Sequence, residues 1–397
     1  MSAEFRQATV PGLLPGNCLH LLHSGVEYFP ALLAAIDGAR FEVHLETYIF
    51  EDDATGRSVA DALQRAVRRG VAVRVLVDGF GARGFAAGLG AALASAGAEV
   101  LTYRPESGRL AIRRHRLRRL HRKLSVIDGA TAFVGGINVV DDFDAGDSGA
   151  PRFDYAVRLE GPLVAHIHQT MRELWRLVRW AYLGHRPPPP PPPPAMPAAC
   201  GSMPAALRVR DNLRHRRDIE DAYLAAIGMA HHEIVIANAY FLPGRRFTRE
   251  LLAAARRGVR VRLLLQGRPD HLLLHYATQA LYGRMLGAGV RVFEYAKAHL
   301  HAKVAVIDDE WATVGSSNID PFSLLLAREA NVVVRDAGFA TNLRASLETA
   351  MADSAREIDP GDQRRRGLLP RLASLAAYAL VRLLLGVTRY GRREYAD

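Results

Sequence analysis

The chain has 397 residues, of which 49% are hydrophobic and 23% charged, a composition that excludes a disordered protein and gives enough length for two domains. Its 52 lysines and arginines outnumber 41 acidic residues, and the net charge of +11 favours anionic partners such as nucleic acid or acidic lipid. Cys18 and Cys200 lack metal-binding spacing and favour a reducing compartment. Neither a signal peptide nor a membrane-spanning helix is predicted.

A run of eight prolines at residues 187–194 divides the chain near its middle. Polyproline lacks backbone donors and is extended and stiff, so the run is interpreted as a linker, with a ligand for a proline-binding partner as the alternative. The predicted segments are a first half, the linker region, a second half, and a basic and apolar tail, at residues 1–186, 187–203, 204–360 and 361–397.

The two halves repeat one order of predicted elements. These pairs are apolar strands at 43–50 and 235–242, helices ending before Gly70 and Gly258, strands at 71–77 and 259–265, and helices ending before Gly97 and Gly289. Strand–helix alternation predicts an α/β fold: two repeated α/β/α-sandwich halves with mixed, mainly parallel sheets, related by a pseudo-two-fold axis. A further helix, at residues 163–183, is predicted to pack its apolar face on the first half.

One polar motif occurs at the same place in both repeats. Its members in the first half are His121, Lys123, Asp128, Gly136 and Asn138, and in the second half His301, Lys303, Asp308, Ser316 and Asn318. The spacing is identical and the copies are 180 residues apart. A single match could arise by chance on a half-exposed strand, but a chance origin for two matching copies is far less plausible.

The spacing of the motif predicts a shared anion site. Residues two apart on a strand point to the same side, so His121 projects with Lys123 and His301 with Lys303. Packing about a two-fold axis would bring both pairs to one point, where a phosphodiester fits between the lysines. Asn138 and Asn318 follow glycine turns and are predicted to donate further hydrogen bonds.

The expected chemistry is phosphoryl transfer through a covalent intermediate. One neutral imidazole attacks phosphorus, and the other, protonated, gives its proton to the leaving alcohol. The lysines stabilise charge on the non-bridging oxygens. No metal and no cofactor are predicted.

Two acidic pairs are assigned different roles. Asp154 and Glu329 each open a strand-like run and are candidates for holding the second ring nitrogen of the histidines, with a salt bridge to a nearby arginine as the alternative. Asp128 and Asp308 sit where a strand turns, and we expect a turn hydrogen bond or salt bridge from them rather than chemistry.

The paired motifs resemble the HKD motifs of the phospholipase D superfamily. Further segments resemble bacterial cardiolipin synthases of the B type, namely residues 45–53, 77–81, 133–138, 154–162, 238–243 and 280–290. The resemblance implies transfer of a phosphatidyl group from one phosphatidylglycerol to another through phosphohistidine. By analogy it favours His121 as nucleophile and His301 as acid. Gly136 departs from the pattern, which has serine there, so phosphate contacts need not be symmetric.

Two basic segments bear on the substrate. An arginine-rich insertion at residues 105–120 leads into His121 and contains Arg113, Arg114, Arg116, Arg118 and Arg119. It could bind lipid headgroups or a nucleic-acid backbone, with a solvated charged loop as the alternative. The tail predicts a helix from Pro370 to about Tyr390, with Arg371, Arg382 and Arg389 on one face. This pattern is typical of a helix lying in a membrane surface, with a helix that caps the core as the alternative.

The prediction is therefore a cardiolipin synthase acting on anionic phospholipid, peripheral to the cytoplasmic side of a bacterial inner membrane. A phospholipase D, a nuclease of the same superfamily and an inactive lipid-binding protein are the alternatives, with nucleic acid the less favoured substrate because of the tail. No oligomeric state is predicted.

Overall fold

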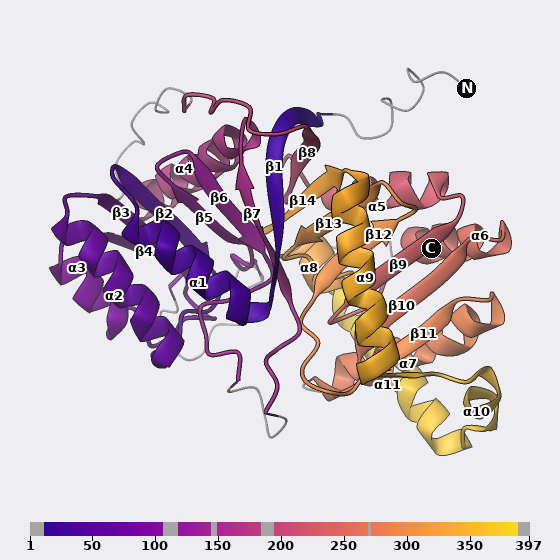
Figure 1. The fold of residues 1–397 in the computed structure, drawn as a ribbon. Coiled ribbons are helices and arrows are strands. Elements are labelled where there is room, and N and C mark those ends of the chain that lie inside the picture. Colours follow the sequence, from indigo (N-terminus) through magenta and orange to yellow (C-terminus); the bar gives the residue numbers. More distant parts are fainter. Residues whose placement is uncertain (1–11, 106–117, 144–148, 184–193, 269–270, 388–397) are drawn as a thin grey trace.

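The computed structural model describes residues 12–105, 118–143, 149–183, 194–268 and 271–387. The proline run up to residue 193, the insertion at 106–117 and Arg389 lie outside the described residues. Figure 1 shows two α/β halves side by side, the first in indigo to magenta and the second in salmon to orange.

The two halves share one order of elements, to which the second half adds one helix before its last equivalent strand and a strand and two helices at its end. In the first half these are β1 (Leu14–His23), α1 (Ser24–Asp37), β2 (Glu42–Thr47), α2 (Ala54–Arg68), β3 (Ala72–Asp78), α3 (Leu89–Ser95), β4 (Glu99–Tyr103), β5 (Lys123–Ile127), β6 (Thr131–Gly135), β7 (Tyr155–Glu160) and α4 (Leu163–Leu183).

In the second half they are β8 (Met203–Arg210), α5 (Asp218–Met229), β9 (Glu233–Asn238), α6 (Arg245–Arg256), β10 (Arg260–Gln266), α7 (Leu272–Gly287), β11 (Arg291–Tyr295), β12 (Lys303–Ile307), β13 (Trp311–Gly315), α8 (Pro321–Leu325), β14 (Glu329–Arg335), α9 (Ala337–Ser354), β15 (Ala355–Glu357), α10 (Pro360–Arg365) and α11 (Leu368–Val387). The added elements are α8, β15, α10 and α11, which have no counterpart among the described residues of the first half.

The strands form one continuous sheet in the order β15-β11-β10-β9-β12-β13-β14-β8-β1-β7-β6-β5-β2-β3-β4. Apart from β15, the strands of the second half follow the same order outward from the junction of β1 and β8 as their equivalents in the first half. A two-fold axis between β1 and β8 requires this symmetry. Cys18 of β1 and Cys200, which precedes β8, are free thiols in contact with each other at this junction.

The mixed α/β fold is confirmed, but the prediction of mainly parallel sheets is wrong. Among the described residues, ten strand pairings are antiparallel and four are parallel. Only strands joined by crossover helices, such as β2 to β3, run parallel. Strands β5 and β6 are joined by a short turn at Asp128–Ala130, which forces an antiparallel hairpin.

The predicted alignment of the two halves is also wrong by one residue. Glu42 and Glu233 both donate their backbone N–H to the aspartate that ends the neighbouring strand, so these two residues are equivalent. The prediction paired Val43 with Val235. A one-residue shift exchanges the two faces of a strand, and it makes Ala239, not Tyr240, the counterpart of Tyr48.

Among the described residues, three large apolar cores and one smaller cluster, which includes Leu174 and Trp175 of α4, hold the molecule together. One lies between α1, α2, α3 and the first half of the sheet, and one between α5, α6, α7 and the second half. A third is shared by strands of both halves with α4 and α9, which pack through residues such as Ile167 and Leu343. The predicted apolar face of α4 is buried, from Ile167 to Val178.

The C-terminal helix α11 is present and only partly covered. Ser374 and Val381 are buried, and Ala377 and Tyr378 pack against the second-half core. The opposite side of the helix is exposed leucine. Within the described part of the chain, no helix is long and apolar enough to span a bilayer.

Candidate active site

Backbone bridges between the halves bring the motif histidines to the site. The His121 N–H donates to the Arg328 carbonyl at 2.9 Å, and the His301 N–H donates to the Phe153 carbonyl at 2.8 Å. Arg328 and Phe153 are the residues just before Glu329 and Asp154. Each histidine therefore lies beside the carboxylate of the opposite half.

The first couple is His121 with Glu329. His121 Nδ1 lies 3.0 Å from Oε1 and 3.1 Å from Oε2 of Glu329, whose side chain is wholly buried. Burial acts to raise the pKa of Glu329, but the charges of His121 and Lys123 and the Ser316 hydroxyl outweigh it and lower that pKa. Burial lowers the pKa of His121, with Glu329 opposing the shift. Glu329 is therefore the ionised partner of this couple.

The second couple, His301 with Asp154, has a different charge balance. His301 Nδ1 lies 2.6 Å from Asp154 Oδ2, and Asp154 Oδ1 accepts the Tyr155 N–H at 2.8 Å. Burial raises the pKa of Asp154 to about 6, against the charge of Lys303. Burial and the positive charge of Lys303 hold the pKa of His301 well below 6.5. With no anion bound, His301 is therefore neutral near pH 7.

Both lysines are buried beside the histidines. Lys123 Nζ donates to the His121 carbonyl at 2.6 Å, and burial lowers its pKa to about 7. Lys303 Nζ lies 2.8 Å from His301 Nδ1 and 3.7 Å from Asp154 Oδ2. Because Nδ1 of each ring faces a carboxylate, Nε2 is the nitrogen left for chemistry. Each imidazole is close enough to feel the charge of both amines, an arrangement that is chemically able to hold a phosphate.

The difference between Gly136 and Ser316 has a steric cause. Ser316 Oγ donates to Glu329 Oε2 at 2.5 Å and accepts the Ala330 N–H at 3.0 Å. At Gly136, an ideal Cβ would lie only 2.5 Å from Asp154 Oδ2. Asp154 is one methylene shorter than Glu329, so its carboxylate lies against the Gly136 backbone and leaves no room for a side chain at residue 136.

The two predicted asparagines have different surroundings. Asn138 is buried, and its Oδ1 accepts the Ile49 N–H at 3.2 Å, which ties the end of β6 to the end of β2. Asn318 is also buried, and its Oδ1 has no hydrogen-bond partner among the described residues. The Asn318 amide therefore has unused acceptor capacity beside the site.

Asp128 and Asp308 lie at the far end of β5 and β12 from the lysines. Asp128 accepts N–H groups from Arg40, Phe41 and Glu42 at 2.7–2.9 Å. Asp308 accepts three equivalent N–H groups at the start of β9, at 2.8–3.0 Å. Both aspartates have positive φ angles, 53° and 50°. These contacts fix the turn and the sheet register rather than the phosphate.

Three groups near the site were missed by the sequence reasoning. Asp78 and Gln266 end equivalent strands and accept the backbone N–H of Leu120 and Leu300, at 2.8 and 3.2 Å, so they hold the segment before each histidine. Tyr48 packs its ring 4.8 Å from the His121 ring. Asp78 and Gln266 could have been identified from the sequence, because each is a polar residue at the end of an apolar strand at the same place in both repeats.

The residue between His121 and Lys123 also differs between the halves. Arg122 is buried and pairs with Glu46 of β2, with 2.9 Å between Nη2 and Oε1. The second half has Ala302 there. Of the insertion, Arg119 Nη1 lies 3.8 Å from Asp78, and its guanidinium lies 4.9 Å from the centre of the Phe80 ring. Arg119 and the Phe80 ring thus lie near the segment that leads into His121.

A family model described as "Cardiolipin synthase, PLD-like domain" matches residues 32–175 and 223–351. The two stretches include both His–Lys pairs and both carboxylates. The chain belongs to this family. It is therefore an enzyme of the phospholipase D superfamily, as the paired motifs predict.

Individual relatives agree with this assignment, and a solved structure shares the fold. Cardiolipin synthase B of Shigella flexneri and of Escherichia coli K12 are each 41% identical over 354 residues, covering 87% of this chain and 83% of the relative. Cardiolipin synthase A of Pseudomonas putida is 32% identical over 367 residues, covering 90% and 73%. The crystal structure of phosphatidylserine synthase from Haemophilus influenzae has the same fold, with a TM-score of 0.68 at 13% identity over 95% of this chain and 98% of that one.

Proposed function

We propose that this enzyme synthesises cardiolipin by transferring a phosphatidyl group from one phosphatidylglycerol to another through a phosphohistidine, with release of glycerol. The observation that carries the proposal is the pair of buried His–carboxylate couples, each made across the two halves, beside two buried lysines. The relatives named cardiolipin synthase support the choice of product.

In the first half-reaction, His121 Nε2 attacks the phosphorus of the donor lipid. The bond from phosphorus to the glycerol oxygen breaks as the P–N bond forms, and His301 Nε2 gives its proton to the leaving oxygen. Lys123 and Lys303 stabilise the non-bridging oxygens. Glycerol leaves, and the phosphatidyl group stays on His121.

In the second half-reaction, His301 Nε2, now neutral, takes the proton from a hydroxyl of the second phosphatidylglycerol. That oxygen attacks phosphorus and the P–N bond breaks, which gives cardiolipin and restores both histidines. Water in place of the second lipid would give phosphatidic acid, so exclusion of water decides between transfer and hydrolysis.

The electrostatics of the first couple support His121 as nucleophile, whereas burial and the charge of Lys303 hold His301 neutral until an anion binds. The ring of a phosphohistidine carries positive charge, and Glu329, with its lowered pKa, is the ionised partner that stabilises it. His301 has to gain and lose a proton in each cycle, and its partner Asp154 has a pKa near 6. A phosphodiester between the lysines adds negative charge beside His301 and favours its protonated form.

The lipid substrates place the reaction at a membrane. We propose that the enzyme is peripheral and acts on the cytoplasmic side of a bacterial inner membrane. The net charge of +11 supports attraction to an anionic lipid surface.

One experiment separates the candidate reactions. The purified enzyme is incubated with phosphatidylglycerol vesicles and, separately, with single-stranded DNA, and the products are resolved. Cardiolipin with equimolar glycerol supports the proposal. Phosphatidic acid without cardiolipin would make the enzyme a phospholipase D, and DNA cleavage without lipid turnover would make it a nuclease.

The roles of the histidines are tested by trapping the intermediate. With a phosphatidyl ester of p-nitrophenol labelled at phosphorus, whose leaving group needs no proton, His301→Asn should accumulate an acid-labile, base-stable phosphatidyl-enzyme, because its breakdown lacks a general base. His121→Asn should form none. Label on His121→Asn but not on His301→Asn would reverse the assignment.

A further inference from the structure

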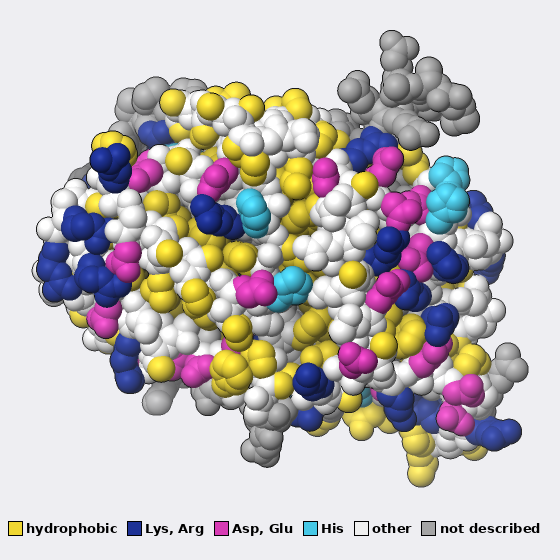
Figure 2. Space-filling model, viewed as in Figure 1, with side chains coloured by type: hydrophobic (Ala, Val, Ile, Leu, Met, Phe, Trp, Pro, Cys, Tyr) yellow, Lys and Arg dark blue, Asp and Glu magenta, His cyan; other side chains and the backbone are white. Residues whose placement is uncertain are grey.

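The helix α11 presents a continuous apolar face to solvent. Seven leucines on this face are between 44% and 81% exposed: Leu368, Leu369, Leu372, Leu375, Leu380, Leu383 and Leu384. Residues 368–387 contain no acidic residue, and their charged residues are Arg371 and Arg382. An exposed apolar face of this kind marks a binding surface. Figure 2 shows hydrophobic side chains projecting at the lower right edge, in the region of α10 and α11, with Lys and Arg side chains nearby.

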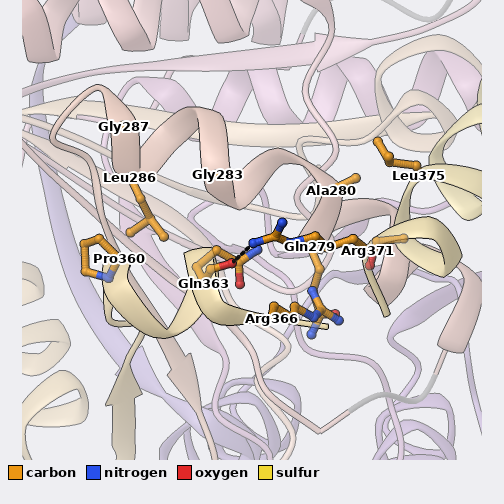
Figure 3. A pocket seen from close by; sticks show the side chains of 11 residues that line it. Gln279, Ala280, Gly283, Leu286, Gly287, Pro360, Gln363, Arg366, Arg371 and Leu375 are labelled. Atoms are coloured by element: carbon orange, nitrogen blue, oxygen red, sulfur yellow. Dashed lines mark hydrogen bonds between the residues drawn. The ribbon is translucent and has the colours of Figure 1, made fainter. Parts of the chain in front are cut away.

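A cavity lies beneath this face, between α7, α10 and α11 (Figure 3). Its volume is about 280 Å³. Small residues of α7, Ala280, Gly283 and Gly287, open the space, and Leu286 and Leu375 make it apolar on one side. A cavity of this size suits a lipid headgroup with its glycerol rather than a whole lipid.

The other side of the cavity is cationic. Arg366 and Arg371 both line it, and no acidic side chain of the described residues does. Arg366 Nη2 donates to the Gln279 amide oxygen at 2.5 Å, and Arg371 Nη2 donates to the Gln363 carbonyl at 3.3 Å. These contacts hold the two guanidinium groups at the cavity. Guanidinium groups bind phosphate oxygens through paired N–H donors.

The start of α7, which packs with α11, also exposes apolar side chains near the active-site edge of the sheet. Helix α7 follows β10, whose last residue, Gln266, holds the Leu300 N–H just before His301. The first turn of α7 exposes Leu272, Leu273 and Tyr276. A bilayer contacting α11 and the start of α7 would therefore lie beside the edge where the substrate phosphate binds.

We propose that α7, α10 and α11 form a second lipid-binding surface, separate from the catalytic site. The exposed leucines of α11 insert into an anionic bilayer, and Arg366 and Arg371 bind the phosphate of one phospholipid in the cavity. A bilayer is the occupant because the face is leucine and alanine with only arginine charges, which complements anionic headgroups above acyl chains. The proposal rests on the proposed function only in that the substrate is also a membrane lipid.

Vesicle flotation tests the surface without requiring turnover. The protein carries His121→Asn, and the vesicles are phosphatidylcholine with or without phosphatidylserine. Leu375→Gln/Leu383→Gln should lower binding to both vesicles by about tenfold or more. Arg366→Gln/Arg371→Gln should weaken only the preference for anionic vesicles, by about fivefold for each arginine.

Matched controls change the same residue types elsewhere. Leu177 and Leu213 are exposed leucines of other segments, and Arg249 and Arg260 are exposed arginines of the second half. Each pair is changed to Gln, and circular dichroism confirms folding of every variant. Binding of the Leu375/Leu383 variant equal to that of the Leu177/Leu213 control would overturn the proposal. If soluble glycerol phosphate displaced the protein from labelled vesicles as strongly as unlabelled vesicles do, the bilayer would be overturned as the source of the phosphate.

An activity arm separates this proposal from the proposed function. With His121 intact, the Leu375/Leu383 variant should make cardiolipin normally from phosphatidylglycerol dispersed in detergent and poorly from vesicles. Equal loss in both assays would mean that the leucines serve the catalytic site, against the proposal. If no variant makes cardiolipin but the flotation differences persist, the proposed function fails and the docking surface stands.

Discussion

Gly136→Ala should slow phosphatidyl transfer, because the added methyl group displaces the Asp154 carboxylate that holds His301. The new Cβ would lie 2.5 Å from Asp154 Oδ2 and 2.8 Å from its Cγ, whereas ordinary contact begins at 3.4 Å. The carboxylate must therefore withdraw by about 1 Å. Since Oδ2 lies 2.6 Å from His301 Nδ1, that hydrogen bond is stretched beyond its useful range. Losing a charge-assisted hydrogen bond costs about 1.5–3 kcal/mol, or about 10- to 150-fold in rate.

The assay is the turnover number for cardiolipin formation in detergent micelles, with thermal unfolding as the folding control. Ser316 and Glu329 coexist in the other half, so Gly136→Ser combined with Asp154→Glu should recover part of the activity that Gly136→Ser alone loses. Wild-type turnover in Gly136→Ala would refute the reasoning. So would a double variant no better than Gly136→Ser.

Three further changes test the electrostatics and packing. Lys123→Met should abolish transfer and weaken a pH dependence of stability. The folded chain releases the proton of the Lys123 amine near pH 7 and the unfolded chain near pH 10.5, so the free energy of unfolding of the wild type should rise between about pH 7 and 10. In urea titrations, the free energy of unfolding of the variant should rise less over the same range. Asp308→Ala leaves three N–H groups at the start of β9 without their acceptor and should lower Tm by several degrees, with kcat per folded molecule within about twofold. Tyr48→Leu should lower kcat about tenfold with little change in KM, while Tyr48→Phe keeps the ring against His121 and should stay near wild type; equal loss in both would assign the role to the hydroxyl.

The sequence was sufficient to predict the repeat and several of the side chains that the fold brings together. A His and a Lys two apart on a strand have to share a side, and a duplicated strand has to present the pair twice, so His121, Lys123, His301 and Lys303 followed from spacing. Asp154 and Glu329 were also proposed as partners, because a catalytic imidazole needs an acceptor. Spacing could not reveal that each carboxylate serves the histidine of the other half, since backbone bridges between distant segments leave no local pattern.

Two errors have local physical causes. The direction of β5 to β7 depends on short turns, and the rule for strand–helix–strand units was applied beyond the strands that helices connect. The alignment of residues 43–50 with 235–242 was shifted by one because two tyrosines were matched to each other. The strand ends are set instead by Asp128 and Asp308, which hold the N–H groups of Glu42 and Glu233.

The crossed bridges between the halves make neither repeat self-sufficient. A half separated from its partner would keep its His–Lys pair on a strand but lose the carboxylate that orients the imidazole, together with the backbone contact that positions it. Two inactive fragments, one per half, would therefore be expected to regain activity only on reassembly. The ancestor of such a duplicated chain would have been a dimer in which each subunit supplied the carboxylate for the other subunit's histidine. Fusion would then have made the pairing of the two halves independent of protein concentration.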